Sequence, residues 1–370
     1  MRINWGIRMV VGLALIGCPV SSWATGDRPH EEASDRTLAV GDIISEHTSD
    51  SYWWHITTIN DRHISLYLPV IVHSPDEGWI VFSSKRLAHG ETYSGFRLAA
   101  EGAYKGKIVG CNAAGEEYRP WDLSITKNAL AILINAVIML TIFLTAARAC
   151  KRQPKNIAPG KFVCAIEILV MNIEEEVIRK SIGDDYKRYS PYLLTAFFFI
   201  LIHNIMGLIP LFPGGANTTG NIAVTLVLAL CTLIAVNLFG NREYWKEIFW
   251  PDVPLWLKAP VPLMPVIELF GVISKPFALM IRLLANIFAG HTVMLALTFI
   301  IFITVKMGSG VNVGMTAFSV LMTVFMSVIE LLVAYIQAYV FTLLSAVFIG
   351  LSRPAAHHAV KTKKINTEKI

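Results

Sequence analysis

Long apolar runs dominate the chain from about residue 128 onward. They cover residues 128–147, 192–212, 221–239, 263–305 and 314–351. A helix needs about 20 apolar residues to cross the hydrocarbon core of a bilayer. The last two runs would be about 60 Å long as continuous helices, so we expect them to be strongly tilted or broken. The pattern predicts an all-α polytopic membrane protein with five crossing helices.

The residues before the first run predict an exported N-terminal region. Residues 1–24 have a basic head, a short apolar core and the small-x-small pattern Ser22-Trp23-Ala24, which is typical of a signal peptide cleaved after Ala24. Leu15 to Cys18 also resembles a lipoprotein processing box, which would place cleavage at Cys18 instead. Residues 25–120 are polar and contain short alternating stretches separated by turn residues, so we expect a small exported domain of β character.

The remaining segments predict the orientation of the membrane domain, residues 121–352. Residues 160–182 have an apolar side and a glutamate-rich side at helical spacing, which favours an amphipathic helix on the membrane surface. Nine lysines and arginines lie in residues 148–190, none in 213–219, three in 241–262 and five in the basic tail 353–370. Because cytoplasmic loops carry the excess of these residues, the N-terminal region should be periplasmic and the C-terminus cytoplasmic, in a bacterial inner membrane.

Composition supports this class and argues against others. The chain is 54% hydrophobic and 16% charged, and its mean hydropathy is +0.53. No basic strip alternates with aromatic residues, which argues against nucleic-acid binding. Five dispersed cysteines without a CxxC pair argue against a disulfide framework or a zinc site, and we expect no metal and no cofactor. No Walker loop occurs, so nucleotide chemistry would belong to partner subunits.

A few ionisable and polar residues interrupt the last two apolar runs. Burying a charge in hydrocarbon is costly, so such residues usually face protein or water and mark an ion path. The residues are Glu268, Lys275, Arg282, Asn286, His291, Glu330 and Gln337.

Their spacing predicts two polar surfaces. Glu268, Lys275 and Arg282 are seven residues apart, a rotation of about 700°, and Asn286 follows four residues later. These four residues would form one stripe. His291 lies nine residues after Arg282, a rotation of about 900°, and therefore points the opposite way. In the last run Glu330 and Gln337 share a face, which leaves a second surface where His291 and Glu330 could meet.

The residue types fit a proton path interrupted by a fixed positive charge. Histidine and glutamate exchange protons near neutral pH when their surroundings tune them. Arginine keeps its proton, so Arg282 would attract a passing carboxylate and block a direct leak. Arg282 could instead have a purely structural role and only neutralise a buried acid. That explanation would suffice for a single ionisable residue, but it fits less well with five ionisable residues in helical register in two neighbouring runs.

Around these residues the sequence resembles the ATP synthase subunit a family. Residues Ile281 to His291 (IRLLANIFAGH) resemble its arginine signature and Val328 to Phe341 (VIELLVAYIQAYVF) its glutamine signature. Residues Asn204 to Pro210 (NIMGLIP) resemble a third, weaker block. The resemblance covers about residues 120–352. Residues 221–230 and 243–252, together with the exported region, look like the form found in bacteroidete bacteria.

The resemblance implies a role for each matching residue. Arg282 would face the ring of c subunits, which supplies the essential carboxylate, and Gln337 and Asn286 would lie with it. His291, Glu330 and Asn204 would form the periplasmic half-channel. Glu268 and Lys275 would sit at the cytoplasmic half-channel.

Further implications concern the neighbours of these residues. The last two spans would form a tilted hairpin against the c-ring, and subunit b and the rest of the complex would be partners.

Some family members carry an acidic residue where this chain has Gly207. Because glycine cannot exchange a proton, we assign Gly207 no role in the proton path. The ion, proton or sodium, would depend mostly on the ring.

Two other classes of membrane protein are alternatives. A secondary transporter could bind an anion or proton at Arg282, but it would carry internal repeats with paired broken helices, and the sequence has none. An intramembrane hydrolase would need a Ser/His pair or an HExxH helix, and Ser309 and His357-His358 are poor candidates in a loop and a tail.

Overall fold

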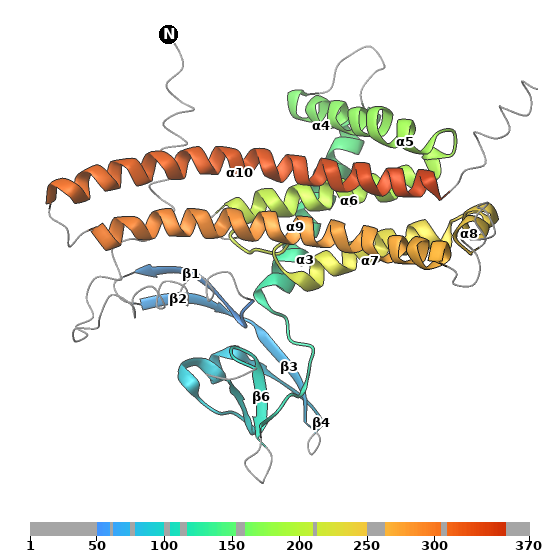
Figure 1. Cartoon of the computed structure of the whole chain (residues 1–370). Helices are drawn as coiled ribbons and strands as arrows, with labels where there is room; N and C mark the ends of the chain where they lie inside the picture. The colour runs from blue at the N-terminus through green and yellow to red at the C-terminus, as the bar shows by residue number, and fades with distance from the viewer. Residues whose placement is uncertain are drawn as a thin grey trace, which may run out of the picture. The chain divides into compact units, whose positions relative to one another are not determined.

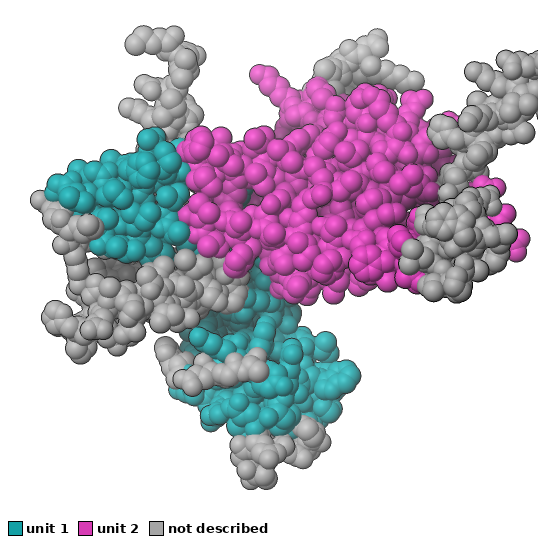
Figure 2. Space-filling model, in the orientation of Figure 1, with its two compact units in different colours: residues 1–134, 206–218, 295–324 teal, residues 135–205, 219–294, 325–370 magenta. Residues whose placement is uncertain are grey.

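A computed structural model gives strands in the N-terminal part of the chain and helices in the rest (Figure 1). It describes residues 50–59, 62–74, 78–99, 104–111, 117–152, 160–209, 213–249, 263–304 and 309–352. The predicted signal peptide, Cys18 and the basic tail 353–370 therefore lie outside the described residues. The chain divides into two compact units, and every contact below lies within one of them (Figure 2).

The N-terminal strands form three small antiparallel sheets, ordered β1-β2, β4-β3-β8 and β5-β6-β7. Their bounds are β1 (Trp53–Ile59), β2 (Arg62–Tyr67), β3 (Pro69–Ser74), β4 (Gly78–Ser83), β5 (Phe96–Leu98), β6 (Ile108–Cys111), β7 (Glu117–Tyr118) and β8 (Trp121–Asp122), with a 3-10 turn η1 (Ser84–Gly90) after β4. Alternation along β3 buries Val70 and Val72, which pack with Phe82, Phe96 and Ile108 in one core.

Two groups of contacts fix the ends of this domain. The hydroxyl of Tyr52 donates to Asp122 Oδ2 at 2.5 Å, and burial, followed by this hydrogen bond, raises the pKa of Tyr52 above its ordinary value. At the first turn of helix α3 (Lys127–Arg152), the Asn128 amide donates to Asp50 Oδ1 at 3.1 Å. Trp54 packs against Ala131 of the same helix. The domain therefore holds the start of α3.

The apolar runs become long helices close to the expected positions. Helices α3, α6 (Tyr186–Leu208), α9 (Leu263–Thr304) and α10 (Ser309–Leu351) are long and apolar enough to cross a membrane. Helix α7 (Ile222–Leu238), expected as the third crossing, has 17 residues and is shorter than the other four. A short helix α8 (Arg242–Phe249) follows it.

The run 263–305, expected to be tilted or broken, is not broken in the structure. Helix α9 runs through Pro276 as one helix of 42 residues. Proline removes one backbone hydrogen bond and usually kinks or ends a helix. Of the two expectations for this run, a break or a tilt, the tilt therefore stays as the prediction.

The amphipathic stretch is helical but not uniform. It comprises α4 (Lys161–Asn172), a π-helical segment η2 (Ile173–Arg179) and the short α5 (Lys180–Ile182). Helix α4 buries no residue, as a surface helix would, whereas η2 buries Ile173, Val177 and Ile178. The second half therefore departs from a regular α-helix, and its apolar side chains join the core formed with α6 and α10. A position at the membrane surface stays a prediction.

Candidate functional site

Helices α9 and α10 pair antiparallel, and this pairing positions most of the predicted site. Lys275 Nζ lies 5.6 Å from the ring centre of Phe348, and Gln337 Nε2 donates to the Arg282 carbonyl at 3.4 Å. Gly290 lies against Glu330. Residue numbers therefore rise along α9 as they fall along α10. In this register Arg282 lies at the level of Gln337, and Gly290 lies at the level of Glu330.

Arg282 lies on an exposed part of α9. Its side chain borders a small cavity between the two helices, lined by Leu279, Arg282, Leu283, Gln337 and Phe341. The ion pairs among the described residues are Arg97 with Glu117 and Lys180 with Glu176. No described acid thus neutralises Arg282. Asn286, one turn further along α9, is also exposed.

Gln337 is buried, with 4% of its surface exposed. Its hydrogen bond goes to the backbone of Arg282, so the guanidinium group is left available for another partner. Gln337 thus contacts the backbone of Arg282 within this unit, and its functional role stays a prediction.

Glu330 is buried in α10, with 7% of its surface exposed. A Cβ atom added at Gly290 would lie 2.8 Å from Glu330 Oε1, so the carboxyl group sits directly against α9 at this glycine. The next residue in α9 is His291, whose side chain lies outside the described part of the structure. The contact therefore brings Glu330 to the backbone beside His291 and does not define the distance between the two side chains.

Asn204 connects helix α6 to the same part of α10. It is buried, and its Nδ2 donates to the Ala334 carbonyl at 3.4 Å. Ala334 lies one helical turn after Glu330. The Asn204 Oδ1 atom has no hydrogen-bond partner among the described residues, and a buried oxygen in that state costs about 1–3 kcal/mol unless water satisfies it.

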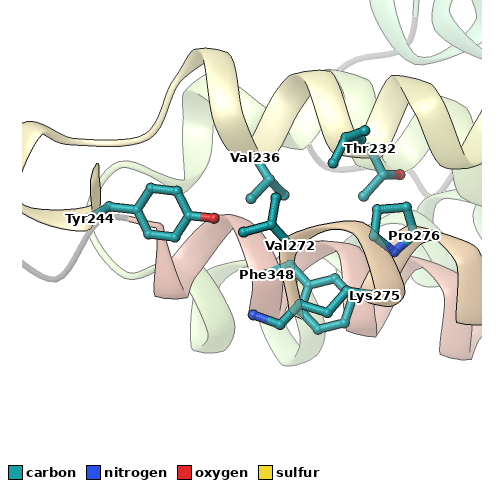
Figure 3. A pocket seen from close by; sticks show the side chains of 8 residues that line it. Thr232, Val236, Tyr244, Val272, Lys275, Pro276 and Phe348 are labelled. Carbon is teal, nitrogen blue, oxygen red and sulfur yellow. The ribbon is translucent and has the colours of Figure 1, made fainter. Parts of the chain in front are cut away.

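Lys275 lines a second small cavity, between α7, α8, α9 and α10 (Figure 3). Its walls are formed by Thr232, Leu233, Val236, Tyr244, Val272, Lys275, Pro276 and Phe348. Burial, followed by the charge of half-buried Glu268, raises the pKa of Tyr244. The first half of α9 thus carries a small group of polar side chains, formed by Glu268, Lys275 and the adjacent Tyr244 of α8.

The structure adds buried polar residues that the sequence did not single out. His203 is 2% exposed, its Nδ1 lies 2.8 Å from the Phe199 carbonyl, and its Nε2 has no partner among the described residues. Because a carbonyl only accepts, Nδ1 carries the proton in the neutral ring. Thr232 bonds Tyr192 at 3.0 Å and Ser345 at 3.3 Å. His203 directly precedes Asn204, the first residue of the NIMGLIP block. This position was the only feature of the sequence that could have pointed to His203.

Among the residues that the structure describes, no group of three or more histidine, cysteine, aspartate or glutamate side chains could hold a metal ion.

Comparison with known proteins places two regions in families. Residues 129–350 match the family described as ATP synthase A chain, and residues 43–124 match a domain of unknown function (DUF8433). The second match covers the strand domain.

Several curated relatives are similar over the helical region. ATP synthase subunit a of Chlorobium phaeobacteroides is 40% identical over 245 residues, which are 65% of this chain and 68% of the relative. ATP synthase subunit a of Myxococcus xanthus is 38% identical over 245 residues, 64% of this chain and 75% of the relative. The likeness to a bacteroidete form stays a prediction. With more than half of its residues matched by the family model, the chain belongs to the ATP synthase A chain family, that of ATP synthase subunit a.

Proposed function

We propose that this protein is the proton-conducting stator subunit of an F-type ATP synthase. It would provide two offset half-channels that carry protons to and from the carboxylates of a c-ring and so couple proton flow to rotation. Family membership supports this role. Its location would be a bacterial inner membrane, with subunit b and the rest of the complex as partners.

The observation that carries the proposal is the environment of Arg282. The residue is exposed on α9, Gln337 bonds its backbone, and no described acid pairs with it. An unneutralised arginine in a membrane-spanning helix is costly, so a carboxylate from another chain is the fitting partner. Each passing ring carboxylate would be held ionised there and would release its proton.

The entry half-channel would run past Glu330. Two observations support this path. The carboxyl group of Glu330 is buried against Gly290, and the Asn204 amide of α6 bonds the Ala334 carbonyl, one helical turn after Glu330 in α10. Water beside the unpartnered Asn204 oxygen would extend the path. His291, in the next position after Gly290, would complete it.

The exit half-channel would lie at Glu268 and Lys275. Polar side chains at this level of α9 support the route: Lys275 and Tyr244 line one small cavity, and the charge of Glu268 contributes to the raised pKa of Tyr244. A proton falling through 100 mV releases about 2.3 kcal/mol, so several protons would have to pass for each ATP made.

Replacing Arg282 tests the proposal. Arg282→Ala should abolish ATP-driven proton pumping and ATP synthesis in the assembled enzyme. Without the arginine, no positive charge would favour loss of the proton from the ring carboxyl group and pair with the resulting carboxylate. Arg148→Ala, at an exposed arginine near the end of α3, is the matched control and should behave as wild type. Both variants should be present in membranes at equal amounts by immunoblot. Normal coupling in Arg282→Ala would refute the mechanism, whereas a transporter using Arg282 would predict that outcome.

A further inference from the structure

The sheet β4-β3-β8 carries an exposed apolar face on the strand domain. Trp79, His73 and Trp121 stand side by side across its three strands, since His73 pairs with both tryptophans. The next row along the strands is Val81, Ile71 and Leu123, because Ile71 pairs with Val81 and its carbonyl accepts from the Leu123 amide. Alternating residues of a strand share a face, so the two rows form one surface.

These side chains are unusually open for their size. The exposed fractions are 54% for Trp79, 66% for Val81, 78% for Trp121 and 64% for Leu123. The opposite face of the same sheet is already used, because Val70, Val72 and Phe82 are buried in the domain core. A contiguous apolar surface of this kind marks a binding site.

The chain itself places this face next to a candidate membrane span. β8 ends at Asp122 and α3 begins at Lys127, so only residues 123–126 lie between them. Five residue steps reach about 17 Å when fully extended. The first turn of α3 is also held by the domain, through the Asn128 amide on Asp50 and the packing of Trp54 on Ala131.

We propose that this face binds the lipid surface of the outer leaflet beside α3. The headgroup layer on each side of the hydrocarbon core is several ångströms thick, which is within reach of a sheet tethered by four residues. Tryptophan is enriched at this depth because its ring is apolar and its N–H can stay in contact with water. The strand domain would thereby brace the outer end of α3 against the bilayer.

The inference requires α3 to cross the membrane with its first turn outside, as the placement of lysine and arginine predicts, and it does not depend on proton conduction. The occupant is the bilayer and not a protein, because the face adjoins a span and its six residues carry no formal charge with neutral histidine. A charged partner would leave complementary charges on the patch.

Spin labels in the assembled synthase test the proposal. Single cysteines Val81→Cys and Trp121→Cys, with Tyr104→Cys as the control, are placed in a chain whose native cysteines are serines. Tyr104 is 40% exposed and lies outside the patch. In vesicles of phosphatidylcholine and phosphatidylglycerol, labels at 81 and 121 should collide more with oxygen than with a water-soluble nickel chelate. The order should reverse at 104.

Two outcomes would overturn the proposal. Collision with nickel at all three positions would place the patch in water. Low collision with both reagents at 81 and 121 would mean that protein covers it. If the labelled variants fail to assemble, brominated lipids replace the labels: they should quench the wild-type tryptophan fluorescence more than that of Trp79→Phe/Trp121→Phe, and equal quenching would count against lipid contact.

Discussion

The contact between Glu330 and Gly290 makes a single methyl group a sensitive probe of the entry path. A Cβ atom at position 290 would lie 2.8 Å from Glu330 Oε1 and 3.1 Å from its carboxyl carbon. Such spacing forces the carboxyl group to move. The buried carboxyl group is the part of this site that the proposed relay needs in place.

Gly290→Ala should therefore lower ATP-driven proton pumping by about tenfold or more, since a misplacement near 1 Å can cost that much in a positioned proton transfer. Gly271→Ala, in the same helix with open space around it, should keep the wild-type rate. Pumping is followed by fluorescence quenching in inverted vesicles with equal subunit content. Equal rates in the two variants would show that the Glu330 position does not limit proton flow.

Gln337 offers a second test at the scale of one residue. Its amide bonds the Arg282 carbonyl and borders the cavity beside the guanidinium. Gln337→Leu keeps a side chain of similar size, removes this bond and should reduce pumping several-fold, less than Arg282→Ala, because the charge itself remains. Thr323→Val, in the same helix, also removes a side-chain hydrogen bond, there within α10, and is the control. A Gln337→Leu enzyme that pumps like this control would contradict a positioning role.

At the scale of elements, the shared face of Glu330 and Gln337 in α10 could be predicted from their spacing, and both residues are buried. The register between α9 and α10 could not be predicted. The seven-residue spacing along α9 and α10 identified Arg282, Gln337 and Glu330, because polar residues in apolar runs stand out. The contact at Gly290 could not be found in this way, because glycine has no side chain and so adds nothing to the pattern of polar and apolar positions. The π-helical segment that buries Val177 and the unbroken α9 at Pro276 also depend on packing with neighbouring helices.

Among the described glycines, Gly350 near the end of α10 has the closest neighbour in another element. A Cβ atom at Gly350 would overlap the backbone carbonyl of Ser181 in α5, and backbone cannot rotate away as a side chain can. Gly350→Ala should cost about 1–3 kcal/mol or more by overpacking. The measurement is the temperature at which the detergent-extracted complex loses the subunit. Gly314→Ala, in open space on the same helix, should not lower this temperature, and an equal drop in both would disprove the contact.

At the scale of the whole molecule, the placement of lysine and arginine predicts which side of the membrane each segment occupies. Two native cysteines can report this without new probes in the fold, because Cys111 of β6 and Cys150 near the end of α3 are both free and exposed. In the sequence, Cys111 precedes the candidate span α3 and Cys150 lies in its last turn. One crossing between them would separate their reactivity toward a reagent that cannot pass the bilayer.

In intact spheroplasts, a membrane-impermeant maleimide should label Cys111 and leave Cys150 unlabelled. Inverted vesicles should give the opposite result, because the basic residues Arg148, Lys151 and Arg152 predict a cytoplasmic location for that end of α3. Single-cysteine variants assign each signal, and detergent-opened membranes, in which both should react, show that neither thiol is merely blocked. Labelling of both from one side would mean that α3 does not cross, which would remove the five-span topology and the lipid contact of the strand domain while leaving the Arg282 test unaffected.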